Sequence, residues 1–266
     1  MKFLRLYLIY IGKFFKSRSQ YKASFIFGIF ANFYCYFITY MTLWITLKKV
    51  EDIAGWNFSE ISFLYSLNLF TYSIGGMLIW YSAYHLDDKV LSGEIDRFLL
   101  RPMGMIKQLI CNQFGSTFIG QILVSLIFMI YSIKDINIQF SMFKIIFFLL
   151  CIISGIMIHM SAMIIIGSLS FRVLKSKKVG SIAYYEIREF IHYPLDIYPS
   201  YMKWILTFVL PWGFINYYPC LILLSKSVSH FEYLLGLFSP FVGLLLLIFS
   251  RKFLYRGINS YSGVGS

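Results

Sequence analysis

Few residues in this sequence have the types and spacing that catalysis or metal binding requires. His85, Asp87 and Asp88 lie together in the run YHLDD and could supply metal ligands. The acidic pair is better suited to capping the helix that follows, because helix N-termini favour carboxylates. The sequence contains no GxxxxGK[ST] phosphate loop, no HExxH and no GxSxG. We therefore expect no catalytic, cofactor or metal site, and no ATP hydrolysis, on this chain.

The cysteines and one isolated histidine do not change this expectation. Cys35, Cys111, Cys151 and Cys220 each lie in or beside an apolar run, without a CxxC pair or a nearby histidine at ligand spacing. Apolar packing is the expected role of all four. His159 stands alone in an apolar stretch, where packing or linking of helices is the expected role.

A polar loop with a helical repeat separates two long apolar runs, in the sequence DDKVLSGEIDRFLLRPMGMIKQ. The repeat predicts a helix over about 88–102 that lies parallel to the membrane and ends at Pro102. Its apolar face comprises Leu91, Ile95, Phe98 and Leu99, and its charged residues are Glu94, Asp96, Arg97 and Arg101. Such a helix either floats at the membrane interface or docks into a groove on a cytoplasmic partner and transmits motion.

A second group of ionisable residues falls within an apolar segment and comprises Glu186, Arg188, Glu189 and His192. Ionisable groups at membrane depth are costly, so they pair with one another or face a protein interior or a water-filled cavity. Two interpretations stay open. Either Arg188 is neutralised by Glu186 or Glu189 within the bundle, or the segment lies at the interface with solvated charges.

The elements that carry these residues are membrane spans. Hydrophobic residues make up 59% of the chain and charged residues 14%, against about 45–50% and about 25% in soluble domains. A helix needs about 20 apolar residues to cross the hydrocarbon layer. Five segments satisfy this requirement or come close to it, and we predict them as transmembrane helices: 23–47, 61–84, 108–133, 145–171 and 233–250.

Two positions are possible for one further crossing. Segment 179–194 is apolar but carries the four ionisable residues, whereas 205–225 is uncharged but contains Pro211 and Pro219. In one model 179–194 crosses the membrane, and 194–225 dips into the outer leaflet and returns. In the other model 205–225 crosses. Both models predict an all-α polytopic membrane protein with six transmembrane helices in a single domain, 1–266.

Residues 1–20 resemble a signal peptide only superficially, because Arg5 and Lys13 interrupt the apolar run and no small-residue cleavage site follows. On a helix, Lys2, Arg5, Lys13 and Lys16 form one stripe, and Leu4, Leu8, Ile11 and Phe15 form the other. This pattern predicts an N-terminal helix that lies in the membrane interface with its basic face toward headgroups.

Basic residues also predict the orientation. The net charge is +12, and lysine and arginine accumulate on cytoplasmic loops of membrane proteins, so we favour a membrane explanation of this charge over nucleic-acid binding. With both termini in the cytoplasm, most basic residues outside the spans lie inside, including Lys89, Arg97, Arg172 and Arg251. Fewer lie outside, among them Lys48, Lys49, Lys134, Lys144, Lys203 and Lys226.

Three runs resemble motifs of a known family. GEIDRFLLRPM resembles the G-x-x-D-x-x-L-x-R-P loop of a bacterial branch of type-2 ABC exporter permeases. The run YPLDIYPSYMKWILTFVLPWGFINYYPCLILL resembles the YP-x-x-IYP … F-x-x-P-x-x-F-x-x-YYP signature of that branch, and GINSYSGVGS resembles its usual ending. Together with the six-span pattern, the likeness covers nearly the whole chain.

This resemblance implies a permease in the bacterial cytoplasmic membrane that forms a dimer, with a sister permease or with itself. Separate ATPase subunits would bind ATP and Mg. The ATPase-coupling helix would contain Leu91, Glu94, Ile95, Asp96, Phe98, Leu99, Arg101 and Pro102. Segment 194–225 would be re-entrant, with Pro194, Pro199, Pro211 and Pro219, which favours 179–194 as the fifth span and places Glu186, Arg188, Glu189 and His192 inside the assembly.

Two other classes of protein compete with an exporter permease. A secondary transporter or channel that acts alone would show internal repeats and paired intramembrane acids. The sequence shows no repeat, and the second to fourth spans contain no acid. An intramembrane enzyme would need a polar catalytic set, and no such set is present. We therefore expect the membrane subunit of an ATP-driven exporter.

Overall fold

The computed structural model describes residues 2–18, 21–47, 52–136, 138, 141–173, 180 and 182–261. Across these residues the chain is helical, and the one β-type pairing is an isolated bridge between Ile53 and Trp56. Five helices are long and apolar enough to cross a membrane, and a bent pair of shorter helices would make a sixth. The expectation of an all-α polytopic membrane protein is confirmed.

The helices have the following bounds: α1 Lys2–Arg18, α2 Lys22–Leu47, α3 Phe58–Tyr84, α4 Leu86–Leu91, α5 Glu94–Leu99, α6 Met105–Asn112, α7 Phe118–Ile136, α8 Met142–Ser168, α10 Ile187–Glu189, α11 Ser200–Trp204, α12 Tyr217–Leu223 and α13 His230–Asn259. Helical turns of 3-10 or π type extend or connect them at Leu169–Phe171, Ile182–Glu186, Phe190–His192, Leu195–Ile197, Ile205–Val209 and Trp212–Phe214.

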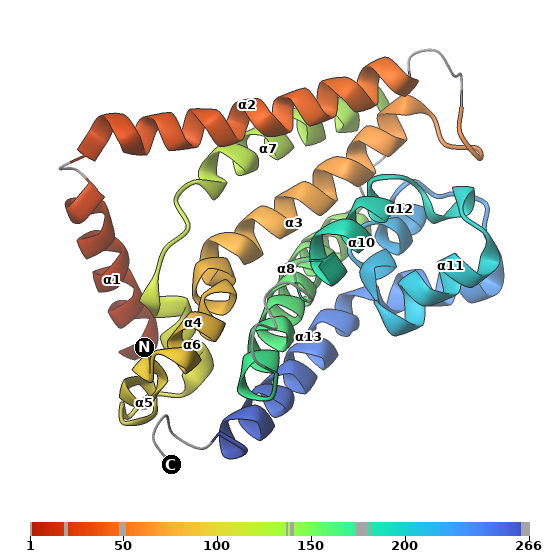
Figure 1. The fold of residues 1–266 in the computed structure, drawn as a ribbon. Coiled ribbons are helices and arrows are strands. Elements are labelled where there is room, and N and C mark those ends of the chain that lie inside the picture. The colour runs from red at the N-terminus through yellow and green to blue at the C-terminus, as the bar shows by residue number, and fades with distance from the viewer. Residues whose placement is uncertain are drawn as a thin grey trace.

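Helix α3 forms the centre of the bundle. It packs against α7 on one side and α8 on the other, while α13 runs along α8 and α2 covers α7 (Figure 1). Most of α3 is buried, whereas most side chains of α2 are exposed. A capping box starts α3, because the Asn57 side chain accepts from Glu60 N–H and Glu60 accepts in return from Asn57 N–H. The central helix therefore begins at a defined residue.

Small residues let α8 and α13 approach closely. A Cβ atom on Gly243 would lie 2.3 Å from the backbone oxygen of Ser154. The Gly243 N–H instead donates to Ser154 Oγ at 3.0 Å, and Ser154 Oγ donates to the Ser239 carbonyl at 2.7 Å. Close backbone approach at small residues with interhelical hydrogen bonds is typical of helices that pack within membranes.

The predicted span 108–133 is not one helix. Residues 108–112 belong to α6, and the chain is non-helical over 113–117 before α7 begins at Phe118. Gly115 lies at this break and donates its N–H to the Met77 carbonyl of α3 at 3.0 Å. Hydropathy missed the break because all of these residues are uncharged.

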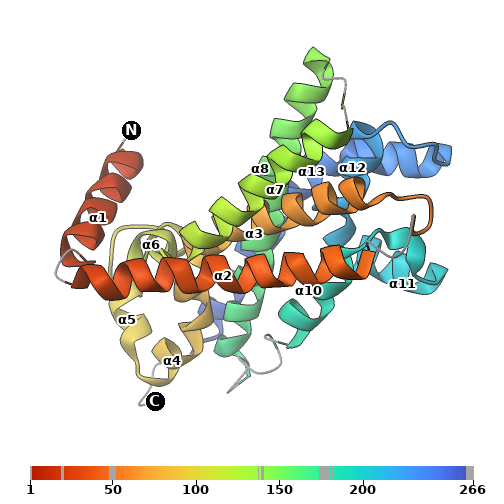
Figure 2. The same ribbon diagram turned by 90° about the horizontal axis from the view of Figure 1, so that it is seen from above.

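The short helices gather at two opposite ends of the molecule. Helices α4, α5 and α6 lie near both chain termini, and α11 and α12 lie at the other end (Figures 1 and 2). Lys175, Lys177, Lys178 and the tail 262–266, which the sequence places in the cytoplasm, lie outside the described residues.

The two candidates for the remaining span have different shapes. The described part of 179–194 is a short helical stretch from Ile182 to His192. The other candidate is bent by 76° between Ser200–Val209 and Trp212–Leu223, which is the geometry of a broken span or a re-entrant loop. Pro211 lies at this bend and cannot donate a helical hydrogen bond.

Candidate functional site

The first candidate site is the polar loop between α3 and α6, residues 85–104, here called the α4–α5 loop. The single helix expected over 88–102 is instead two helices, because α4 ends at Leu91 and α5 begins at Glu94. Gly93 between them has a φ of 69°, a left-handed conformation that ends a helix and that glycine adopts without strain.

The break divides the expected apolar face. Ile95 and Phe98 are buried, whereas Leu91 and Leu99 are 47% and 43% exposed and Leu100 is 86% exposed. Glu94, Asp96, Arg101 and Pro102 are exposed as well. The loop thus presents leucine side chains surrounded by charges, which is the composition of a surface that docks onto another protein.

Phe98 holds the loop to the bundle. Its ring lies 4.6 Å from Lys89 Nζ and 5.2 Å from the Arg101 guanidinium. Gln108 Nε2 of α6 donates to the Phe98 carbonyl at 2.7 Å and to the Met103 carbonyl at 2.6 Å. Because Gln108 is itself buried, a force on α5 would pass to α6.

The second candidate site surrounds Arg188. The guanidinium lies 3.8 Å from the ring centroid of Tyr72 on α3, and the side chain is 4% exposed. Tyr184 lies beside it, and the Tyr184 hydroxyl hydrogen-bonds His159 Nδ1 at 2.9 Å. Trp212 packs against both His159 and Tyr184. We call these five residues the arginine cluster; the sequence indicated only Arg188 as a possible member of a buried site and treated His159 as solitary.

The acidic residues expected around Arg188 are not buried with it. Glu186 and Glu189 are exposed, and Glu189 Oε1 lies 3.9 Å from Arg188 Nη2. Glu189 makes its closer contact with His192 Nδ1, at 3.0 Å. Full neutralisation of Arg188 by these two acids is therefore not what the structure shows. The face of the Tyr72 ring contributes a cation–π contact instead.

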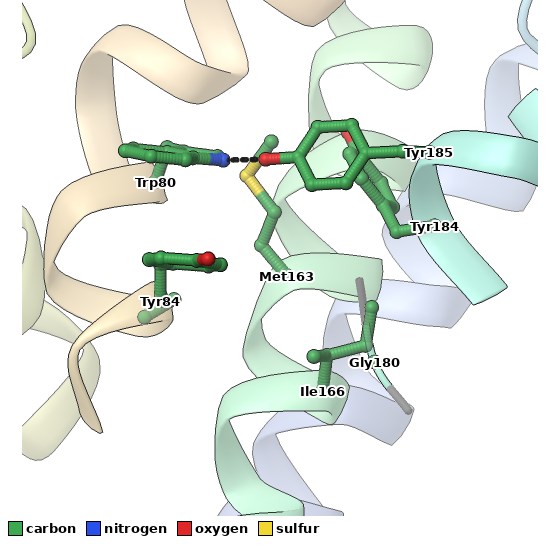
Figure 3. Close-up of a pocket in the computed structure, with 8 residues that line it drawn as sticks. Trp80, Tyr84, Met163, Ile166, Gly180, Tyr184 and Tyr185 are labelled. Atoms are coloured by element: carbon green, nitrogen blue, oxygen red, sulfur yellow. Dashed lines mark hydrogen bonds between the residues drawn. The ribbon is translucent and has the colours of Figure 1, made fainter. Parts of the chain in front are cut away.

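Beside the arginine cluster, Trp80 stacks on Tyr84 with ring centroids 4.8 Å apart, and its indole N–H donates to the Tyr185 hydroxyl (Figure 3). Met163 and Ile166 of α8 line the same small cavity, whose volume is about 30 Å³. This volume suits about one water molecule. The cavity is thus a packing gap beside the cluster and is too small for an organic ligand.

A third polar group, which the sequence did not reveal, lies at the α11 end. Asp196 accepts hydrogen bonds from Trp56 Nε1 at 2.9 Å and from the Tyr217 hydroxyl at 2.6 Å. Lys203 Nζ lies 2.9 Å from Asp196 Oδ1 and 2.5 Å from Glu232 Oε1. We call Trp56, Asp196, Lys203, Tyr217 and Glu232 the α11-end network. It joins the α2–α3 loop, the segment before α11 and the start of α13.

The network holds the pKa of the Asp196 carboxyl below its ordinary value. Burial alone would raise this pKa, but hydrogen bonds from Tyr217, Lys203 and Trp56 and the Lys203 charge outweigh burial. Next to it, Lys226 Nζ lies 2.6 Å from Glu60 Oε2. Partners far apart in the sequence, such as Trp56 and Asp196, carry no local signal, so only the three-dimensional structure could reveal them.

The four prolines of the predicted re-entrant segment have distinct local roles. Pro194 and Pro199 have extended backbone on either side of Asp196, Pro211 lies at the 76° bend, and Pro219 lies in the first turn of α12. Proline is tolerated in a first helical turn because the N–H groups there have no intrahelical partner.

The remaining candidates for chemistry stay apart. His85 pairs with Asp88 at 2.9 Å, and Asp87 is buried. Within the described part of the chain, no three His, Cys, Asp or Glu side chains gather as metal ligands. Cys111, Cys151 and Cys220 are buried and Cys35 is exposed, all as free thiols.

The geometry is that of a helical membrane protein with an exposed, charged loop at one end and a tied polar network at the other. A family model described as ABC-2 family transporter protein matches residues 33–265. The chain therefore belongs to the ABC-2 transporter family, a family of membrane transport components. Searches for similar curated proteins and for similar solved structures return no match.

Proposed function

We propose that this chain is the permease subunit of an ATP-driven exporter, working as a dimer with a sister permease or with a second copy. The observation that carries the proposal is the α4–α5 loop, whose exposed Leu99, Leu100 and Arg101 suit a cytoplasmic partner. The absence of a phosphate loop in the sequence requires that ATP and Mg bind to a separate ATPase subunit.

The proposed orientation places the α4–α5 loop and both termini in the cytoplasm of a bacterial inner membrane. The lysines assigned to the outside support it, because Lys203 and Lys226 engage in ion pairs at the α11 end. In this orientation Pro194–Ser225 is the re-entrant outer segment and 179–194 is the fifth span. The 76° bend at Pro211 is consistent with a segment that enters the outer leaflet and returns.

The proposed mechanism is a population shift. ATP binding closes the partner ATPases, and the closed form makes different contacts with the two α4–α5 loops from those of the open form. This difference biases the membrane dimer between inward-open and outward-open states. Gln108 would transmit the bias, since it joins the loop to α6 through the Phe98 carbonyl.

Affinity purification of the tagged chain from native membranes, followed by mass spectrometry, tests the proposal. Recovery of an ATPase that carries a phosphate loop is the expected result. A second six-span protein in the same fraction would identify a heterodimer. Recovery of the chain alone, under conditions that preserve a known ABC complex, would instead favour a stand-alone transporter.

A further inference from the structure

Two adjoining cavities lie between α1, the start of α2 and the α6–α7 break. One has a volume of about 280 Å³ and is lined in part by Lys13, Ser17, Asn112 and Gln113. The other has a volume of about 240 Å³ and is lined in part by Ser24, Ser116 and Thr117. Both are also lined by Gln113 and Phe114, so they form one continuous hollow, here called the α1–α7 cleft.

The polar lining of the cleft suits an anion. Its polar side chains are hydroxyls, amides and one ammonium group, that of Lys13, and no carboxylate lines either cavity. Lys13, Asn112 and Gln113 are exposed, so their donors are accessible to a ligand. A hydrogen bond between a charged acceptor and such donors is about twice as strong as a neutral one.

The surroundings of the cleft are apolar and exposed. Phe114 packs against Phe14 and Phe15 with ring centroids 5.5 Å and 5.7 Å apart, and Phe15 packs against Phe25. Phe27 and Phe30 on the adjacent α2 are 75% and 67% exposed. In a membrane protein such side chains face lipid, so the polar hollow opens beside the hydrocarbon region.

A polar, cationic hollow bordered by lipid-facing aromatic rings fits an amphiphile with an anionic head. The volume of each cavity is several times the roughly 30 Å³ that a water molecule occupies in the liquid. The geometry points to the α1–α7 cleft as a binding site for an anionic phospholipid. Its phosphate lies at Lys13 and Gln113, and its chains lie along the exposed face of α2. Assignment to the inner leaflet rests on the orientation proposed above, whereas binding itself does not.

Native mass spectrometry of the purified protein, with any subunits that co-purify, tests this site. Phosphatidylglycerol and phosphatidylcholine are added separately, and the retained lipid is counted. Phosphatidylglycerol is expected to bind more tightly, and Lys13→Gln is expected to weaken its binding about tenfold, the loss that follows from removing one charge-assisted hydrogen bond. Gln113→Leu is expected to act in the same direction.

The matched control is Lys252→Gln, which removes one exposed positive charge from α13, outside the cleft. It is expected to leave lipid retention unchanged. Equal retention of phosphatidylglycerol by the native chain and by both cleft variants would overturn the site. Equal retention of the two lipids would overturn its preference for an anion. Displacement of phosphatidylglycerol by millimolar inorganic phosphate would assign the site to free phosphate. Retention is read from the permease itself, so the result is separate from whether an ATPase co-purifies.

Discussion

At the scale of single residues, the molecule accommodates charge inside an apolar bundle in two ways. Arg188 is buried with the face of its guanidinium against Tyr72, and its Nε and Nη1 have no hydrogen-bond partner among the described residues. A planar, weakly hydrated guanidinium tolerates such stacking better than an ammonium group would. Asp196 and Lys203 instead satisfy each other and neighbouring donors in the α11-end network.

The composition of the sequence indicated that 186–192 would contain a buried ionisable group, but it did not indicate which residue. The helical turn places Arg188 toward Tyr72 on α3, and it leaves Glu186 and Glu189 on the exposed side. Tyr72 is distant in sequence and uncharged, so hydropathy and charge counting give no sign of it. The burial of Arg188 therefore depends on packing between elements.

Asp196→Asn is expected to destabilise the protein at pH 7. The substitution leaves one acceptor oxygen where three donors converge and removes the charge opposite Lys203. Because the site is partly exposed, we expect a loss of about 1–2 kcal/mol in the free energy of unfolding. Thermal unfolding in detergent measures it, with Asp52→Asn, an exposed residue of the same loop as Trp56, as the control for lost charge.

The pH dependence of this difference has a defined sign. The folded-state pKa of Asp196 lies below its ordinary value, so its contribution is fully present above about pH 4, the unfolded value. The contribution disappears as the pH falls through the lower, folded value. The stability difference between the native chain and Asp196→Asn should therefore shrink on acidification, and a difference that grows would contradict this account.

At the scale of elements, long apolar runs define the spans, and short interruptions define their ends. The periodicity over 88–102 continues through Ser92 and Gly93, so the sequence pattern alone predicts one helix. The left-handed φ of Gly93 divides it and exposes Leu91 and Leu99 while Ile95 stays buried. The break at 113–117 was missed for a related reason, because uncharged residues give no hydropathy signal for a non-helical turn.

Gly243→Ala tests the contact between α8 and α13. Alanine favours a helix over glycine by about 1 kcal/mol, but its Cβ would meet the Ser154 backbone, which cannot move alone. We expect the packing cost of about 1–3 kcal/mol to exceed the gain, so the unfolding temperature should fall. Gly12→Ala is the matched control, because nothing lies within 4 Å of its Cβ. An unfolding temperature that rises equally in both variants would show that α8 and α13 are not in close contact.

At the scale of the whole molecule, the fold has two functional ends joined by a central helix. The α4–α5 loop and the α1–α7 cleft lie toward one end, and the α11-end network lies at the other (Figure 1). Helix α3 runs between them, with Trp56 and Glu60 near its start and α4 directly after its end. Movement of one end relative to the other is what alternating access requires of such a bundle.

Much of this whole-molecule arrangement follows from the sequence, and the remainder does not. Five spans follow from uncharged runs long enough to cross the bilayer. The bend at Pro211 is consistent with proline chemistry, but its 76° angle depends on packing against α13 and α3. Neither cavity of the α1–α7 cleft follows from the sequence, because each combines residues from α1 or α2 with the break at 113–117.

The central claim is that the α4–α5 loop contacts a separate ATPase. Photo-crosslinking in native membranes tests it most directly, with a photoreactive amino acid placed at Leu99 and, as a control, at Ile197, which is 37% exposed near the opposite end. The account predicts that position 99 crosslinks to a protein with a phosphate loop and that position 197 does not. No such adduct at position 99, or equal adducts at both positions, would contradict the claim.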